Sequence, residues 1–548
     1  MNIDAAFGTV GPDVIHHFFD KSHYYLGTIS SVGNSAVKVQ IENLSILQSR
    51  ILDNESIYPN TVNYFVLVDG TQGIFIGKVS FASIKDSESI HVLMKSGKLD
   101  RIYPEEDLDI LAICKSDQLS FSPSGFTTVG IHDKVYVAPL RIVKTYIDSL
   151  ELLDEAKKEN PLSSFSVLSN AGGVPIDFKP ATLFSRHLMV IGTTGSGKST
   201  SALSIIDKLV KNHIKVLMID PTGEYRSSFS TAEIRKLSLG IDTKIAPGSL
   251  SINQWIGLLN ASPGIQAPAI MTAIQALRFQ QKNGIHGIYH KKFQQYSSIA
   301  DNIASLTPND TEFSLELLTK QLLEEAVSEN SSGKLMPNDF KLNAIRLLTE
   351  RLNQKMQTSD LRNFFSNRPQ YSLLAQLSFF LNNQDSLYID ASQIGATDDT
   401  GGMIVDLISR YINQNKTSTQ DSFVFFVDEV HRYAVKQQTD QDEYYQGLSI
   451  LAREGRKQGI YLLLTTQSPN DVSNIVFGQI GSLLIHRLTQ SDELYAVKNF
   501  VDDGTRARIP FLGQGEAVLS SVNLLHNIQL RINPTDRTHH NSSPSLQR

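Results

Sequence analysis

The alternation of apolar and polar positions predicts strands in the first 140 residues of the chain. Val37, Val39 and Ile41 alternate with polar residues, which is the period of a strand with one buried face. Two apolar runs separated by the glycine-containing turn 69–73 predict a hairpin, and the run KVYVAPL over 134–140 predicts a further short strand. Several short strands joined by glycine turns are typical of a small barrel or sandwich.

The pattern changes near residue 165, where the apolar runs become continuous. Such runs occur at 188–191, 216–219, 423–427, 461–465 and 482–485. Strands buried on both faces have this composition, and they belong to parallel sheets covered by helices. Between these runs lies a long stretch with helical periodicity. The predicted organisation is a β-rich domain over 1–150, an α/β core over 165–260 and 385–534, a helical insertion over 261–384, and a polar C-terminal tail over 535–548 that is loosely ordered unless a neighbouring segment holds it.

A glycine-rich loop follows the first continuous run. Its sequence GTTGSGKS fits the pattern G-x-x-x-x-G-K-[ST], whose glycines let several backbone N–H groups face one anion, while the next helix adds its partial positive charge. Lys198 is predicted to reach the β and γ phosphates and Ser199 to bind Mg²⁺. The alternative is a strand–helix turn without a ligand. The predicted nucleotide-binding residues are Gly192, Thr193, Thr194, Gly195, Ser196, Gly197, Lys198, Ser199 and Thr200.

An acidic pair ends another apolar run. Asp428 and Glu429 follow FVFFV, which places them at the carboxyl edge of the predicted sheet, where α/β proteins bind ligands. Asp428 is predicted to hold Mg²⁺ through its water shell. Glu429 is predicted to polarise the attacking water, which favours hydrolysis over transfer to a small acceptor. The alternative is that both carboxylates only cap the next helix.

Three polar residues near the next strand complete the set of candidate catalytic residues. Gln467 ends the run YLLLTTQ and is well placed to sense the γ-phosphate. Arg453 and Arg456 precede this run on a helical stretch. Either arginine could reach across a subunit boundary and stabilise transition-state charge as an arginine finger. The alternative is that both arginines are simply solvated.

Composition limits the class of protein. With 548 residues, 41% hydrophobic and 19% charged, the chain is expected to form two to four globular domains. The net charge of −6 offers no bulk attraction to nucleic acid, although a local patch or a pore built from several copies remains open. The single cysteine, Cys114, is predicted to lie in the core. One cysteine cannot form an intrachain disulfide, which fits a cytoplasmic protein. No apolar run approaches the roughly 20 residues of a membrane helix, and the N-terminus lacks a signal-peptide pattern.

Four motifs taken in order resemble those of the HerA-type ATPases, which belong to the HerA/FtsK group of hexameric DNA pumps. These motifs are GTTGSGKS, VLMIDPTGEY, FVFFVDEVHRYA and AREGRKQGIYLLLTTQSP. GQGEAVLS near the C-terminus resembles the last strand of that family. The resemblance covers about 185–225 and 385–535, whereas the β-rich domain matches in texture and the insertion in position only. Asp220 and Glu224 match a family motif in which Thr222 stands where histidine is common.

This resemblance implies more than the motifs themselves indicate. It implies a RecA-like core with a mostly parallel sheet, a small N-terminal β-barrel and a helical insertion. It further implies a homo-hexameric ring that binds ATP and Mg²⁺ at subunit interfaces and passes duplex DNA through its pore. Arg456 becomes the better finger candidate and Arg453 the second. The barrel would dock a partner effector, either a nuclease such as NurA or, in phage defence, another enzyme.

A basic and aromatic stretch in the insertion, HGIYHKKFQQY, stays ambiguous at this point. Its basic side chains are His286, His290, Lys291 and Lys292. They could contact DNA phosphates, which requires no sequence specificity, or they could belong to a solvated loop.

The favoured function is an ATP-driven translocase or helicase acting on double-stranded DNA. A different class remains open, namely a nucleotide-gated hexameric scaffold that assembles and activates an effector, with DNA pumping secondary. The absence of an apolar membrane segment argues against a membrane-anchored conjugation or segregation pump. The Asp428–Glu429 pair and the chain length argue against a small-molecule kinase.

Overall fold

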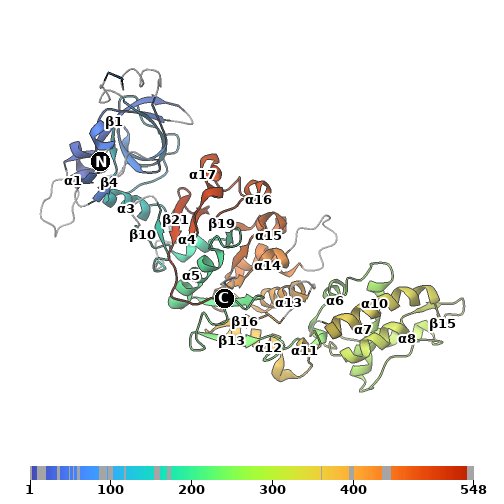
Figure 1. Cartoon of the computed structure of the whole chain (residues 1–548). Coiled ribbons are helices and arrows are strands. Elements are labelled where there is room, and N and C mark those ends of the chain that lie inside the picture. The colour runs from blue at the N-terminus through green and yellow to red at the C-terminus, as the bar shows by residue number, and fades with distance from the viewer. Residues whose placement is uncertain are drawn as a thin grey trace, which may run out of the picture. The chain divides into compact units, whose positions relative to one another are not determined.

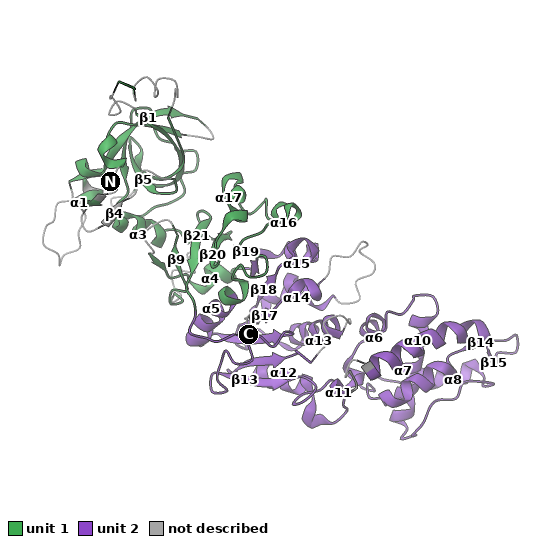
Figure 2. Cartoon of the chain, viewed as in Figure 1, with its two compact units in different colours: residues 1–185, 192–201, 481–534 green, residues 186–191, 202–480, 535–548 purple. Residues whose placement is uncertain are grey.

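In the computed structural model (Figure 1), the chain forms two compact units (Figure 2). Unit 1 comprises 1–185, 192–201 and 481–534, and unit 2 comprises 186–191, 202–480 and 535–548. The residues that the structure describes are 3–8, 20–33, 37–47, 50–52, 55–57, 62–84, 95–96, 103–115, 119–152, 161–169, 174–358, 361–393, 400–434 and 446–539. Among the helices of these segments, none is long and apolar enough to cross a membrane.

Six antiparallel strands of unit 1 close into a barrel in the order β1-β2-β7-β6-β5-β8. The strands are β1 Tyr25–Val32, β2 Val37–Ile41, β5 Phe65–Gly70, β6 Gly73–Ser83, β7 Glu105–Cys114 and β8 Lys134–Val137. The alternating positions predicted for β2 are buried as expected. Gly73 has φ +144°, and a Cβ there would lie 2.4 Å from the carbonyl oxygen of Cys114, so this turn requires glycine. Cys114 itself is fully buried. The predicted β-barrel is confirmed.

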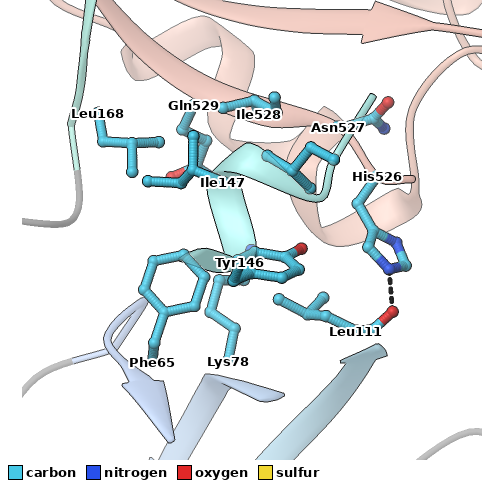
Figure 3. A pocket seen from close by; sticks show the side chains of 11 residues that line it. Phe65, Lys78, Leu111, Tyr146, Ile147, Leu168, His526, Asn527, Ile528 and Gln529 are labelled. Carbon is cyan, nitrogen blue, oxygen red and sulfur yellow. Dashed lines mark hydrogen bonds between the residues drawn. The ribbon is translucent and has the colours of Figure 1, made fainter. Parts of the chain in front are cut away.

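A helix and a set of antiparallel strands follow the barrel in unit 1. Helix α3 spans Leu140–Asp148, and the strands run in the order β10-β9-β21-β20-β19. The strand bounds are β9 Ser166–Leu168, β10 Pro175–Ile176, β19 Ile480–Ile485, β20 Glu516–Ser521 and β21 Ile528–Ile532. A small pocket lies where barrel strands, α3 and the residues before β21 meet (Figure 3). In this pocket His526 Nε2 donates a hydrogen bond to the carbonyl of Leu111, and Lys78 and Tyr146 line the wall.

Unit 2 contains a parallel sheet in the order β11-β18-β17-β12-β16-β13. The strands are β11 His187–Ile191, β12 Lys215–Asp220, β13 Ile234–Ser238, β16 Ser386–Asp390, β17 Phe423–Val427 and β18 Ile460–Thr466. Every residue of β11, β12, β16 and β17 is buried, as the continuous apolar runs predict. Helices α5 (Lys198–Lys211), α13 (Thr400–Asn415) and α14 (Gly447–Glu454) connect strands of this sheet in the chain. The predicted α/β fold with a mostly parallel sheet is confirmed.

The predicted insertion is helical and has a small core of its own. Helix α6 (Ile252–Leu258) precedes the predicted bounds of 261–384. The elements within them are α7 Gln266–Lys282, α8 Tyr296–Ala304, α9 Leu318–Glu324, the hairpin β14 Val327–Glu329 and β15 Leu335–Pro337, α10 Asp339–Thr358, α11 Leu361–Phe364 and α12 Leu373–Asn382. Ala276, Tyr289 and Ile299 pack together in the core cluster. The chain closes on itself at Ile245, before the predicted insertion, and Phe364, within it, because Ile245 N–H donates to the carbonyl of Phe364 over 2.7 Å.

The described part of the C-terminal tail is held by unit 2. Arg537 Nε lies 2.8 Å from the carboxylate of Asp207 in α5, and a second guanidinium nitrogen lies 2.5 Å from Glu233. The guanidinium also stacks over Phe229. Ser228 donates its hydroxyl to the carbonyl of Thr538 over 2.7 Å. A neighbouring segment therefore does hold the tail up to residue 539, and 540–548 lie outside the described residues.

Candidate functional site

The glycine-rich loop has a backbone that only glycine adopts with ease. In the chain it joins β11 to α5, and Gly195 and Gly197 have φ of +75° and +112°. A Cβ on Gly197 would lie 3.1 Å from the backbone nitrogen of Gly515, so this loop packs against backbone as well. The glycines therefore serve both the left-handed turns and the close approach.

Backbone hydrogen bonds within unit 1 fasten the loop at two points. Thr193 N–H donates to the carbonyl of Arg487 over 2.9 Å, and Gly515 N–H donates to the carbonyl of Ser196 over 3.0 Å. Lys198 is buried at the first position of α5, and its ammonium lies 3.4 Å from the carbonyl of Thr193. The lysine thus folds back over the loop, as a phosphate-binding lysine does.

The sheet of unit 2 brings the ends of several strands to one edge. Ile191 at the end of β11 pairs with Thr466 at the end of β18, and Val427 at the end of β17 pairs with Leu464. Because these strands are parallel, the chain enters the glycine-rich loop from the edge where Asp428 and Gln467 leave the sheet. This edge is where open parallel sheets bind ligands.

Asp428 is held by a threonine on the neighbouring strand. The residue is 4% exposed, and its carboxylate accepts a hydrogen bond from the hydroxyl of Thr465. Burial raises the pKa of Asp428 to about 7, against the Thr465 hydrogen bond that lowers it, and the negative charges of Glu429, Asp220 and Glu224 raise it further. A divalent cation would favour the ionised form at this place, so the environment of Asp428 fits Mg²⁺.

Glu429 lies in a left-handed conformation, with φ 48° and ψ 51°. Its backbone N–H donates to the hydroxyl of Thr465 over 2.8 Å. Its carboxylate lies 3.3 Å from Nδ1 of His431, which is also 3.2 Å from the hydroxyl of Thr466. Left-handed backbone in a residue other than glycine is strained and concentrates at functional sites.

The capping alternative finds no support for Glu429. It occupies the N-cap position of the short helix η8 (Val430–Arg432), yet its side chain makes no capping hydrogen bond there. The backbone strain and the contact with His431 therefore need another reason than helix capping.

Two other acidic strand ends have structural partners. The carboxylate of Asp220 accepts hydrogen bonds from the backbone N–H groups of Gly223 and Tyr225 and from the hydroxyl of Tyr388, over 2.8 to 2.9 Å. Asp390 pairs with Arg226. Asp220 thus organises the turn that carries the DPTGEY stretch, which accounts for its presence without a catalytic role.

The two candidate finger arginines are exposed at the end of α14. Arg453 lies in the last turn of α14 and Arg456 in the following helix η9 (Gly455–Gln458). His187 fixes this end of the helix, because its Nε2 donates to the carbonyl of Ala452 over 2.8 Å while its Nδ1 accepts from Leu462 N–H. These two hydrogen bonds tie the end of α14, beside both arginines, to β11 and β18.

The basic stretch of the insertion is largely neutralised. Lys291 is buried and lies 2.6 Å from Glu325, which is also buried. Lys292 and His290 both face Glu324, at 3.0 and 3.8 Å. The interpretation as a phosphate-binding patch is wrong for Lys291, and so is a solvated loop, because this ammonium forms an internal ion pair.

Sequence reasoning missed four residues of the site. Thr465, Thr466 and His431 surround the acidic pair, and His486 lies against the phosphate loop in unit 1. A signal existed for three of them, because the threonines directly precede Gln467 and His431 stands two residues after Glu429. His486 is 289 positions beyond Gly197, so the spacing of residues in the sequence does not predict that it lies against the phosphate loop.

A family model described as "Helicase HerA, central domain" matches residues 166–412, a range that includes the phosphate loop and ends before Asp428. The chain has the central domain of a HerA-type ATPase. A probable helicase of Methanocaldococcus jannaschii is 22% identical over 86% of this chain and 90% of its own length. The DNA double-strand break repair helicase HerA of Sulfolobus acidocaldarius is 23% identical over 61% of this chain and 62% of its own length.

Solved structures also resemble this chain, with lower sequence identity than these relatives. VirB4 of Thermoanaerobacter pseudethanolicus matches 69% of this chain and 98% of its own chain, with a TM-score of 0.49 and 13% identity.

Proposed function

We propose that this HerA-type chain hydrolyses ATP and uses the energy to move along double-stranded DNA. One observation carries the proposal, namely that the phosphate loop leaves the sheet of unit 2 at the edge that also presents Asp428 and Glu429. Relatives named as helicases support the DNA substrate. Because the net charge of one copy is −6, DNA would be contacted through local basic groups, which a ring of several copies would bring together.

Lys198 and the loop N–H groups would hold the triphosphate, and Ser199 would give its hydroxyl to Mg²⁺. Asp428 would hold the same ion through its water shell. When bound, Mg²⁺ would neutralise phosphate charge. The described residues contain no group of three or more His, Cys, Asp or Glu side chains that could hold a metal, which is consistent with an ion held largely by phosphate and water.

Glu429 would orient the attacking water and accept its proton. The strained backbone and the contact with His431 aim this carboxylate, since a group held in one geometry loses less entropy on reaction. Gln467 would sense the γ-phosphate from the end of β18. Arg456, with Arg453 as the second candidate, would reach the nucleotide of the neighbouring copy in a homo-hexamer.

The N-terminal barrel would dock a partner effector, either a nuclease or a defence enzyme. Closed barrels leave the outer faces of their strands available for such contacts. The resemblance to the HerA family supports this part of the proposal, and no partner is identified by it.

The test is the ATPase rate and native mass of the purified protein with and without duplex DNA. We expect DNA-stimulated hydrolysis by a ring-sized assembly. Lys198→Ala should abolish nucleotide binding, and Glu429→Gln should bind ATP but lower the turnover at least about a hundredfold, as removal of a general base does. Glu350→Gln on the exposed side of α10 is the matched control and should turn over normally.

A monomer whose hydrolysis ignores DNA would refute translocation. Hydrolysis-independent activation of an effector by the ring would instead favour the nucleotide-gated scaffold. Normal turnover in Glu429→Gln would remove Glu429 from its proposed role.

A further inference from the structure

A buried histidine lies against the phosphate loop in unit 1. His486 follows β19 directly and has no exposed surface. A Cβ on Gly192 would lie 2.6 Å from Cβ of His486, and a Cβ on Gly197 would lie 3.6 Å from its Cε1. The histidine therefore spans the loop from its first to its third glycine and forms the floor on which the loop rests.

Both ring nitrogens of His486 are engaged. Nδ1 lies 2.9 Å from the carbonyl oxygen of Glu516, and Nε2 lies 2.9 Å from the hydroxyl of Ser201. A carbonyl oxygen only accepts, so Nδ1 carries the hydrogen and Nε2 accepts from the Ser201 hydroxyl. The two partners thus select one neutral tautomer.

The surroundings also keep this imidazole neutral. Burial lowers the pKa of His486 to about 4, against the hydrogen bond to Glu516 that raises it, and the charge of Lys198 lowers it further. A second positive charge under the loop is therefore absent at neutral pH, and the acceptor for Ser201 persists.

Ser201 lies in the first turn of α5, three residues after Lys198. This turn also carries Ser199 and Thr200, so the hydrogen bond to His486 acts on the whole group that would receive the phosphates. The backbone hydrogen bonds that join the loop to Arg487 and Gly515 hold the same loop that rests on His486.

We propose that His486 is a positioning residue for nucleotide binding, because its neutral imidazole holds Ser201 and thereby sets the first turn of α5 before ATP arrives. The inference rests on the proposed ATP-binding function and adds a residue to it. The side chain contacts the loop and Ser201, so its effect is expected on affinity and not on the chemical step.

The test compares His486→Leu, which keeps an apolar body without nitrogens, with His486→Gln, whose carbonyl oxygen can accept from Ser201. The measurements are the Kd of a fluorescent ATP analogue with Mg²⁺, and KM and kcat for ATP. We expect the leucine variant to bind about tenfold more weakly, the size expected for one lost buried hydrogen bond, with KM rising in parallel and kcat within about twofold. The glutamine variant should recover most of the affinity.

Ser201→Ala completes a double-mutant cycle. It should weaken binding in the parent protein and have no further effect in the His486→Leu background, because the partner is already lost. Additive losses, or leucine-variant binding equal to that of the parent, would overturn the inference.

His526→Leu is the matched control, since His526 is a half-buried histidine of the same unit that also bonds a backbone carbonyl (Figure 3). It should lower the melting temperature without changing the Kd. An equal loss of affinity in this control would mean that general destabilisation explains the His486 result, which overturns the inference. If the parent protein fails to bind ATP, both proposals fail; if Lys198→Ala abolishes binding while His486→Leu does not, only this one fails.

Discussion

At the scale of single residues, Asp428 makes the stability of the nucleotide-free protein depend on pH. Its pKa rises from 3.8 to about 7 on folding, mainly through burial. A carboxyl with a raised folded pKa stabilises the fold below its unfolded pKa, and this contribution is lost as pH rises through 7. The change corresponds to about 4 kcal/mol at most. Asp428→Asn should therefore melt at a higher temperature than the parent protein at pH 8, with the difference shrinking toward pH 5.

Thermal melts at four pH values between 5 and 8 measure this effect. Mg²⁺ with ATP should narrow the difference at pH 8, because the ion would stabilise the ionised carboxylate of the parent only. Parallel melting curves across the pH range would contradict the raised pKa of Asp428.

Thr465 connects the two acidic residues and is a second residue-scale target. Its hydroxyl donates to Asp428 and accepts from the N–H of Glu429. Thr465→Val leaves both groups without this partner, which should cost about 1–3 kcal/mol of stability and lower ATP turnover at least about tenfold. Thr465→Ser keeps the hydroxyl and should stay near the parent in both. A valine variant as active as the serine variant would exclude a role for this hydrogen-bonded link.

At the scale of elements, the tail segment around Arg537 braces α5. Arg537→Ala removes one cationic partner of the almost fully buried Asp207, which keeps its pair with Lys211, and should lower the melting temperature at pH 7. The hydrogen bond from Arg537 is the main cause that lowers the pKa of Glu233 to about 2. Because the folded pKa is depressed, this stabilisation is present above about pH 4.3 and is lost as pH falls toward 2. The melting difference should therefore shrink between pH 5 and pH 3.

Arg531→Ala is the control, since it removes an exposed guanidinium from β21, the strand that precedes the tail. It should leave the melting temperature nearly unchanged. If both variants melt alike at pH 7, the Arg537 contacts contribute nothing measurable.

The elements themselves followed from local patterns. The period of β2 and the continuous runs of β11 and β17 depend only on neighbouring residues, and the structure confirms them. Long-range partners do not leave such a pattern. Lys291 meets Glu325 and His486 meets Ser201 because the chain returns from far away, and neither the period nor the spacing of residues encodes that return. The predicted roles of Glu429 and Arg456 remain predictions for the same reason.

At the scale of the whole molecule, the net charge of −6 sets an expectation for DNA binding. If duplex DNA passes through the ring, its contacts are phosphate contacts that release counterions. The DNA concentration that half-maximally stimulates the ATPase should then rise steeply between 50 and 200 mM salt, by about 10³-fold for roughly six phosphate contacts. The basal ATPase rate serves as the internal control, because it should change little over this range. Salt-independent stimulation would speak for the scaffold function.

The hydrogen bond that closes the helical segment between residues 245 and 364 has a consequence for how such chains diversify. Ile245 and Phe364 are hydrogen-bonded to each other, so the segment between them leaves the core and returns to it at one place, as a closed loop does. Loop-closure entropy grows only slowly with loop length, so residues between these anchors can be gained, lost or exchanged at little thermodynamic expense. Gln254 of α6 donates a hydrogen bond to Asp406 of α13, so α6 is tied to the core. The segment best suited to exchange therefore begins after α6. Lineages, and protein engineers, can thus fit a new accessory module at this site while leaving the strands that lead to Asp428 in register.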